Sequence, residues 1–203
     1  MKVLAIETST LTGSVALLED DRVVEERVLS NQLQHSVDLM PAIDEVLSKN
    51  KMPLSGIDLF AVGNGPGSFT GLRIGIATAQ GLALPFQKPL VGISSLHALA
   101  CQGADFEGLV IPCLNAYRNE IYWGLYQKVP GTFWLEPVLE DRVTSVEMLL
   151  KEVKERDEKA LFLGHGYDAS HPKASHVGFL ALEQWKKGER SSTVLPRYLR
   201  SPG

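Results

Sequence analysis

The sequence predicts an α/β protein with two lobes, each built on a mixed sheet flanked by helices. Short β-rich segments open the chain, and helical and strand patterns then alternate. Between Gln102 and Gly108 the composition turns to loop residues, which predicts a boundary between an N-terminal lobe, 1–103, and a smaller C-terminal lobe, 104–203. With 203 residues, 44% of them apolar and 22% charged, the chain can bury a core without disulfides or metals.

The first lobe begins with three β-rich segments separated by short turns. A helix should follow, because Val37, Met40, Ile43 and Leu47 recur at helical spacing, and Pro41 should kink it. The next patterns alternate between strand and helix. The expected strands are Val3–Thr8, Ser14–Glu19, Arg22–Leu29, Ile57–Gly63 and Leu90–Ile93, and the expected helices are Leu33–Lys49, a helix capped by Ser68 or Thr70 that runs to Leu84, and Ser95–Cys101.

The second lobe has weaker patterns. Thr144, followed three residues later by Glu147, has the spacing of a capping box and predicts the start of a helix. The expected strands are Leu109–Leu114, Ile121–Tyr126, Thr132–Leu139 and Leu161–Leu163; the expected helices are Ser145–Glu155 and Ala174–Lys187, and Val194–Leu199 should be extended.

Charge and cysteine usage narrow the class of protein. The net charge of −4 lacks the basic stripe of a protein that grips nucleic acid alone, so another subunit should supply most contacts to any RNA. Cys101 and Cys113 have no motif spacing and are expected to be reduced, semi-buried thiols. No signal peptide precedes the first strand, and no apolar stretch approaches the roughly 20 residues of a membrane span. The sequence therefore predicts a cytoplasmic protein with no membrane partner.

The glycine-rich stretch from Gly63 to Gly75 joins a strand to a helix, a layout that can cradle phosphate. However, no Lys-Ser/Thr pair follows its last glycine, and Ser68 stands where a dinucleotide fingerprint needs its third glycine. The glycines can equally serve a tight turn and close backbone packing. At the end of the first strand, Glu7-Thr8-Ser9 likewise fits either a metal–phosphate site or a hydrogen-bonded hairpin turn.

The helix after this loop carries a strip of small residues. Gly71, Gly75, Ala79 and Ala83 recur every four positions, which lets another helix approach closely, and Arg73 is the only charge of the helix. A helix that is apolar nearly all round is buried on two sides. The sheet covers one side, and either more of this chain or another protein covers the other.

No catalytic residue and no metal site are predicted. His35 has no histidine partner at i+4, and His165, His171 and His176 are scattered through loop-like sequence. Ser68 lacks the Gly-x-Ser-x-Gly pattern of a nucleophile elbow.

Several motifs, spread over almost the whole chain, together resemble the bacterial TsaB (YeaZ) family. The glycine-proline-glycine motif is the most specific of them. The motifs are Leu4-Ala5-Ile6-Glu7-Thr8-Ser9, His35-Ser36, Gly65-Pro66-Gly67-Ser68-Phe69-Thr70-Gly71-Leu72-Arg73-Ile74-Gly75, Ser94-Ser95-Leu96 and Pro196-Arg197-Tyr198-Leu199-Arg200.

The resemblance implies a fold of the actin/Hsp70/sugar-kinase class. It implies a non-catalytic subunit that dimerises with a TsaD-like transferase in tRNA threonylcarbamoyladenosine biosynthesis, with a TsaE-like ATPase as third member. The subunit would form a homodimer in isolation, meet tRNA only indirectly and need no cofactor of its own, since ATP and metal would belong to its partners. Two helices would pack against the equivalent pair of the partner, and periodicity places six residues at this contact: Val37, Met40, Gly71, Ile74, Gly75 and Thr78. A vestigial phosphate or ligand loop would comprise Glu7, Thr8, Ser9, Gly65, Gly67 and Ser68.

The sequence departs from the family pattern at two places. Glu7 stands where the family usually has aspartate, and Asn115-Ala116-Tyr117 stands where it usually has Asp-Ala-Arg. Two alternatives stay open. One is an autonomous nucleotide-binding enzyme of the kinase or ATPase class, supported by Glu7-Thr8-Ser9 and the glycine loop. The other is a metalloprotease, which the glycoprotease label of the wider family implies.

Overall fold

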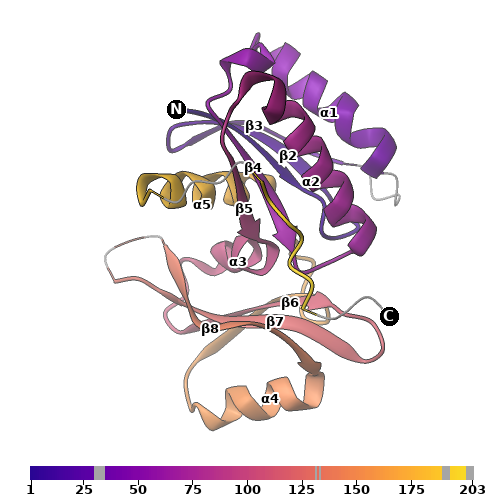
Figure 1. The fold of residues 1–203 in the computed structure, drawn as a ribbon. Coiled ribbons are helices and arrows are strands. Elements are labelled where there is room, and N and C mark those ends of the chain that lie inside the picture. The colour runs from indigo at the N-terminus through magenta and orange to yellow at the C-terminus, as the bar shows by residue number, and fades with distance from the viewer. Residues whose placement is uncertain (30–34, 131, 133, 189–192, 200–203) are drawn as a thin grey trace. The chain divides into compact units, whose positions relative to one another are not determined.

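The structure, a computed structural model, describes residues 1–29, 35–130, 132, 134–188 and 193–199. It divides into two compact units, one formed by Met1–Ser95 with Pro172–Arg197 and the other by Leu96–His171 with the residues from Tyr198 onward. Each unit contains one mixed sheet flanked by helices (Figure 1). The predicted fold class is therefore confirmed.

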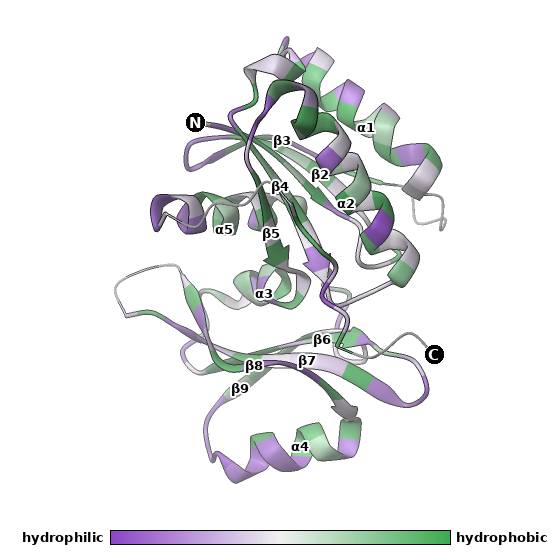
Figure 2. Ribbon diagram, viewed as in Figure 1, coloured by the Kyte–Doolittle hydropathy of each residue, from purple (hydrophilic) through white to green (hydrophobic). Residues whose placement is uncertain are grey.

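The first sheet has the strand order β3-β2-β1-β4-β5. β1 pairs antiparallel with β2 and parallel with β4, so the opening meander and the later crossover strands share one sheet. Four of these segments form strands with apolar side chains on both faces, namely β1, β2, β4 and β5, whereas β3 at the edge carries charged residues. Figure 2 shows the central strands as mostly hydrophobic. The strands are β1 (Lys2–Glu7), β2 (Ser14–Glu19), β3 (Arg22–Val28), β4 (Leu59–Gly65) and β5 (Leu90–Ser94).

Helices cover both faces of this sheet. On one face, α1 (His35–Lys49) and α2 (Phe69–Ala83) pack on a core that includes Leu4, Ile6 and Leu17. On the other face lies α5 (Ala174–Lys186), where Gly178 packs against Leu18 and Ala5. Successive strand residues point to opposite faces, which explains why the neighbours Leu4 and Ala5 contact different helices.

The position of α5 differs from the sequence prediction, which assigned this helix to a lobe spanning 104–203. The helix returns to the first sheet and belongs to the first unit. It can do so because Gly178 has no side chain, so the helix approaches the Leu18 side chain closely. Two hydrogen bonds fix its start, from Ala174 N to Ser14 Oγ (2.8 Å) and from Ser175 Oγ to Glu26 Oε2 (2.8 Å).

The second unit has a four-stranded sheet of order β8-β7-β6-β9, in which only β6 and β9 are parallel. One face packs on α3 through Leu96 and Leu99, and the other packs on α4 through Leu149 and Val153. The elements are α3 (Ser95–Ala100), β6 (Leu109–Asn115), β7 (Glu120–Lys128), β8 (Leu135–Ser145), α4 (Val146–Glu155) and β9 (Ala160–Gly164); three short 3₁₀ helices are Leu54–Gly56, Leu84–Phe86 and Cys101–Gly103.

Two predicted element ends differ from the structure, and a third lies outside the described residues. The predicted end of a strand at Leu139 is wrong, because β8 continues to Ser145 in pairing with β7. The predicted cap at Thr144 is wrong by one residue, since Ser145 Oγ accepts the hydrogen bond from Met148 N. The predicted helix start at Leu33 lies outside the described residues.

Candidate functional site

The carboxyl end of β1 carries a buried acid. Glu7 is fully buried; its Oε1 accepts a hydrogen bond from Ser9 N (2.6 Å) and its Oε2 accepts one from Ser95 Oγ (2.9 Å). Gly63 leaves space for this carboxyl, because a Cβ there would collide with Glu7 Oε2. Burial raises the pKa of Glu7 above its ordinary value, and the hydrogen bonds from Ser9 and Ser95 oppose this rise.

Glu7→Gln should remove one source of pH dependence from stability. A carboxyl whose pKa is raised by folding stabilises the protein fully below its unfolded pKa, and this contribution is lost as the pH rises through the folded pKa. The variant should therefore gain stability over the wild type as the pH rises above about 4.3, by up to about 1.4 kcal/mol per pH unit, until the folded pKa is passed. Urea unfolding across this range measures the difference.

The amide group of glutamine fits the same place, since it can accept from Ser9 N and donate to the Ser95 hydroxyl. Glu136→Gln, on an exposed part of β8, controls for the loss of one carboxyl. Parallel pH profiles for wild type and Glu7→Gln would contradict the assignment.

The glycine loop packs against the chain's own backbone. Ser68 N donates to Ser9 O (2.7 Å), and a Cβ at Gly67 would collide with that same carbonyl oxygen. Ser68 Oγ caps α2 by accepting from Gly71 N (3.3 Å), which decides between the two predicted caps. The close approach that these glycines allow is thus to Glu7-Thr8-Ser9, and one backbone N–H of the loop is already used there. The sequence left two interpretations of these glycines open, a phosphate-binding loop and close backbone packing. The contacts seen in the structure are those of close packing.

The strip of small residues on α2 faces the sheet. A Cβ at Gly71 would collide with Thr8 O, and a Cβ at Gly75 would collide with Thr8 Oγ1, which donates to Gly71 O (2.8 Å). Ala79 and Ala83 are buried in the same core. The strip therefore serves a helix-on-strand contact inside the first unit, and the prediction that Gly71 and Gly75 lie on a docking surface is wrong, because neither is exposed.

The other four predicted contact residues are at least partly exposed on α1 and α2, although Ile74 also packs against the core of the first unit. Val37 and Met40 on α1 are 63% and 49% exposed, and Ile74 and Thr78 on α2 are half-buried. The two helices lie next to each other on one face of the sheet (Figure 1). We call these four residues the α1–α2 face. Three of the four, Val37, Met40 and Ile74, are apolar, where a surface helix ordinarily presents polar side chains.

A further pair on α2, Phe69 and Arg73, was not predicted from the sequence. Phe69 is 41% exposed, and the Arg73 guanidinium lies 3.7 Å from the centroid of its ring, a cation–π contact. Their spacing of four residues on a helix was the available signal.

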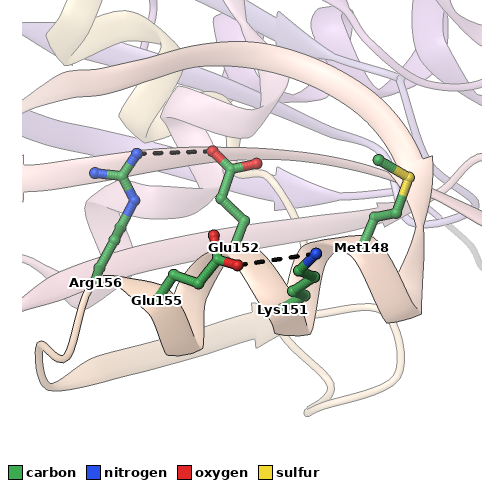
Figure 3. A pocket seen from close by; sticks show the side chains of 5 residues that line it. All are labelled: Met148, Lys151, Glu152, Glu155 and Arg156. Atoms are coloured by element: carbon green, nitrogen blue, oxygen red, sulfur yellow. Dashed lines mark ion pairs between the residues drawn. The ribbon is translucent and has the colours of Figure 1, made fainter.

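The second unit offers a depression of about 440 Å³ along α4, lined by Met148, Lys151, Glu152, Glu155 and Arg156. Its charges pair with one another: Lys151 with Glu155 at 3.9 Å and Arg156 with Glu152 at 3.7 Å (Figure 3). Arg142 adds a second contact to Glu152, at 3.3 Å. Such a set of paired surface charges is typical of a solvated helix face.

No group of three metal-ligating side chains is found among the described residues. Burial raises the pKa of the Cys101 thiol to about 12, and burial together with the charge of Asp168 raises that of Cys113 to about 12. Neither thiol is therefore a thiolate at neutral pH. None of the described helices is long and apolar enough to cross a membrane.

The first sheet, with its antiparallel meander, two parallel crossover strands and helices on both faces, together with the second mixed sheet, defines a protein of the actin/Hsp70/sugar-kinase class. Comparison with known proteins narrows this class. A family model described as "TsaD: tRNA N6-adenosine threonylcarbamoyltransferase" matches residues 22–182. A protein of Bacillus subtilis named "tRNA threonylcarbamoyladenosine biosynthesis protein TsaB" is 36% identical, over 98% of this chain and 94% of its own.

The Escherichia coli protein of the same name is 39% identical over 66% of this chain and 58% of its own. A solved structure from Pseudomonas aeruginosa, described as similar to peptidase YeaZ, superposes with a TM-score of 0.84 at 30% identity, covering 98% of this chain and 99% of the other. The structure named YeaZ from the same organism gives 0.82 at 28% identity with the same coverage. This chain belongs to the TsaB (YeaZ) family.

Proposed function

We propose that this chain is the non-catalytic partner of a TsaD-like threonylcarbamoyl transferase in tRNA threonylcarbamoyladenosine biosynthesis, and that it binds this partner through the α1–α2 face. The observation that carries the proposal is the exposure of Val37 and Met40 on α1, a helix that lies next to α2, where Ile74 and Thr78 are partly exposed. Covering such a face with another protein lowers the free energy, because apolar surface is removed from water. The biosynthetic process named in the proposal follows from the family to which the chain belongs.

The hydrogen bonds and the protonation states of polar groups in this chain support the non-catalytic role. The hydroxyl of Thr8 and the carboxyl group of Glu7 form hydrogen bonds within the first unit, and both thiols are held in their neutral form. ATP and metal then belong to partner subunits, one of them a TsaE-like ATPase. The complex works in the cytoplasm, where it modifies tRNA, and this chain forms a homodimer through the same face when the partner is absent.

Size-exclusion chromatography with light scattering tests the proposal. Purified alone, the chain should run as a homodimer, and addition of an equal amount of the TsaD-like subunit from the same organism should convert it into a one-to-one heterodimer. Two proteins that elute separately at micromolar concentration would overturn the proposal. The metalloprotease and the autonomous nucleotide-binding enzyme would then be tested by metal analysis and by calorimetry with Mg-ATP.

A further inference from the structure

A second pocket, of about 390 Å³, lies in the second unit at the N-terminal end of α4. Its volume is within the usual range of small-molecule sites, about 300–1,000 Å³. Three segments far apart in the sequence form it: the turn between β6 and β7, the first residue of α4, and the residue that follows β9. Its lining residues are Asn115, Tyr117, Arg118, Asn119, Glu120, Ile121, Val146 and His165.

The pocket lies where an α/β sheet ordinarily binds ligands. Asn115 is the last residue of β6, and His165 comes directly after β9, which pairs parallel with β6. Open α/β sheets bind their ligands outside the carboxyl ends of their strands, and the carboxyl ends of β6 and β9 both lie at this edge. Val146 brings the N-terminus of α4 to the same edge, and the helix dipole there favours negative charge.

The turn that supplies most of the lining is held in an unusual conformation. Tyr117, Arg118 and Asn119 have φ of 58°, 54° and 61°, three consecutive left-handed residues without a glycine. Asn115 Oδ1 accepts from Tyr117 N (2.8 Å), and Ala116 N donates to Glu120 O (3.1 Å), so both ends of the turn are fixed. Tyrosine and arginine are costly in this region, and such strain is found at binding and switch sites.

The side chains on this turn are exposed and available. Tyr117 is 66% exposed, and Arg118 forms no ion pair or side-chain hydrogen bond with any residue that the structure describes. His165 adds an imidazole, the two asparagines add amides, and Glu120 is the one acidic side chain in the described lining. An exposed aromatic ring, a guanidinium without a partner among the described residues and planar amides together match a nucleotide. The base can stack on the ring, the phosphate can bind the guanidinium, and the hydrogen-bonding edge of the base can bind the amides.

We propose that this pocket binds a nucleotide, with the base stacked on Tyr117 and the phosphate bound by Arg118. The nucleotide is either an unpaired residue of an RNA strand or a free mononucleotide. The RNA source rests on the proposed function, since a subunit of a tRNA-modifying complex works beside unpaired tRNA residues. The binding itself needs only the isolated chain.

The test is an NMR titration of the ¹⁵N-labelled full chain with three probes: adenosine monophosphate, a single-stranded RNA hexamer and the same hexamer in a duplex. The amides of Asn115–Glu120, Val146 and His165 should shift in a saturable way. Tighter binding of the single strand than of the mononucleotide assigns the site to RNA, and equal binding assigns it to free nucleotides. No shift at these amides with any probe, or shifts with the duplex alone, would overturn the proposal.

Two variants separate binding from folding. Tyr117→Asn and Arg118→Asn remove the ring or the cation, and asparagine tolerates the left-handed region. Each should melt at or a few degrees above the wild-type temperature. Each should nevertheless bind the probe at least about tenfold more weakly, the effect of one lost stacking or charge-assisted contact. Undiminished binding in both would contradict the site.

Lys151→Gln, which removes one positive charge from α4, is the matched control and should bind as the wild type does. All three variants should still form the heterodimer with the TsaD-like subunit, because none of these residues belongs to the α1–α2 face. The NMR titration tests the nucleotide site, and light scattering tests heterodimer formation. Failure of the first is therefore distinguished from failure of the proposed function.

Discussion

Gly71→Ala should destabilise the protein by about 3 kcal/mol, the upper part of the usual range for overpacking. An alanine Cβ at this position would collide with Thr8 O, a backbone atom of the residue that directly follows the central strand β1, and a backbone atom cannot rotate away as a side chain can. Separating α2 from β1 would also break the bond from Thr8 Oγ1 to Gly71 O (2.8 Å) and open the core around Leu72 and Ile76. Urea unfolding followed by circular dichroism measures the change in the free energy of unfolding.

The same helix provides the control. Gly81 has no atom within 4 Å of an added Cβ and is exposed. Gly81→Ala should therefore stabilise the protein by about 0.5–1 kcal/mol, since alanine is the better helix former. A loss of stability at Gly81 equal to that at Gly71 would show that helix formation, and not the contact with Thr8, determines the effect.

The contact between α2 and Thr8 determines which substitutions can test the interface. The sequence pattern suggests Gly75→Arg as a probe of partner binding. In the structure the position faces Thr8 Oγ1 and Ile6, so arginine there would disrupt the first unit before any partner is met. Loss of association in that variant would report on folding alone.

The elements of the first lobe could be predicted because their signals are local. β1, β2 and β3 are separated by turn residues, and α2 follows a glycine-rich turn that ends in a hydroxyl cap. The end of β8 could not be predicted, because Glu140 and Asp141 have low strand propensity and the charged Arg142 follows them. The strand continues past them because pairing with β7 resumes beyond a register shift, for example between Trp123 and Arg142.

The candidate site was predictable only in part, because local spacing shows which residues share a helix face but not what that face contacts. The spacing of Gly71 and Gly75 shows that something approaches α2 closely, but it does not say whether this is a strand of the same chain or another protein. Val37 and Met40 were selected by the periodicity that also selects the core residues Ile43 and Leu47, and only the structure separates the exposed pair from the buried pair. The pocket beside Arg118 needs β6, α4 and β9 brought together, which no local pattern encodes.

Met40→Glu should weaken the heterodimer with the TsaD-like subunit by at least about 30-fold, or about 2 kcal/mol, because it would bury an unpaired charge in an apolar contact. Val37→Glu should act in the same direction. Both side chains are exposed in the isolated chain, so the free energy of unfolding should change by less than about 0.5 kcal/mol. Titration calorimetry or light scattering with the partner measures the loss.

Met148→Glu is the matched control, because Met148 is 62% exposed on α4 and lies outside the α1–α2 face. It introduces the same charge in place of the same side chain, so it should leave the heterodimer unchanged. If all three variants bind alike, the partner does not cover the α1–α2 face, and the exposed apolar residues of α1 need another explanation. If only the two α1 variants fail while their stability is kept, the face is the site of association, and the buried strip of α2 acts by fixing the helix behind it.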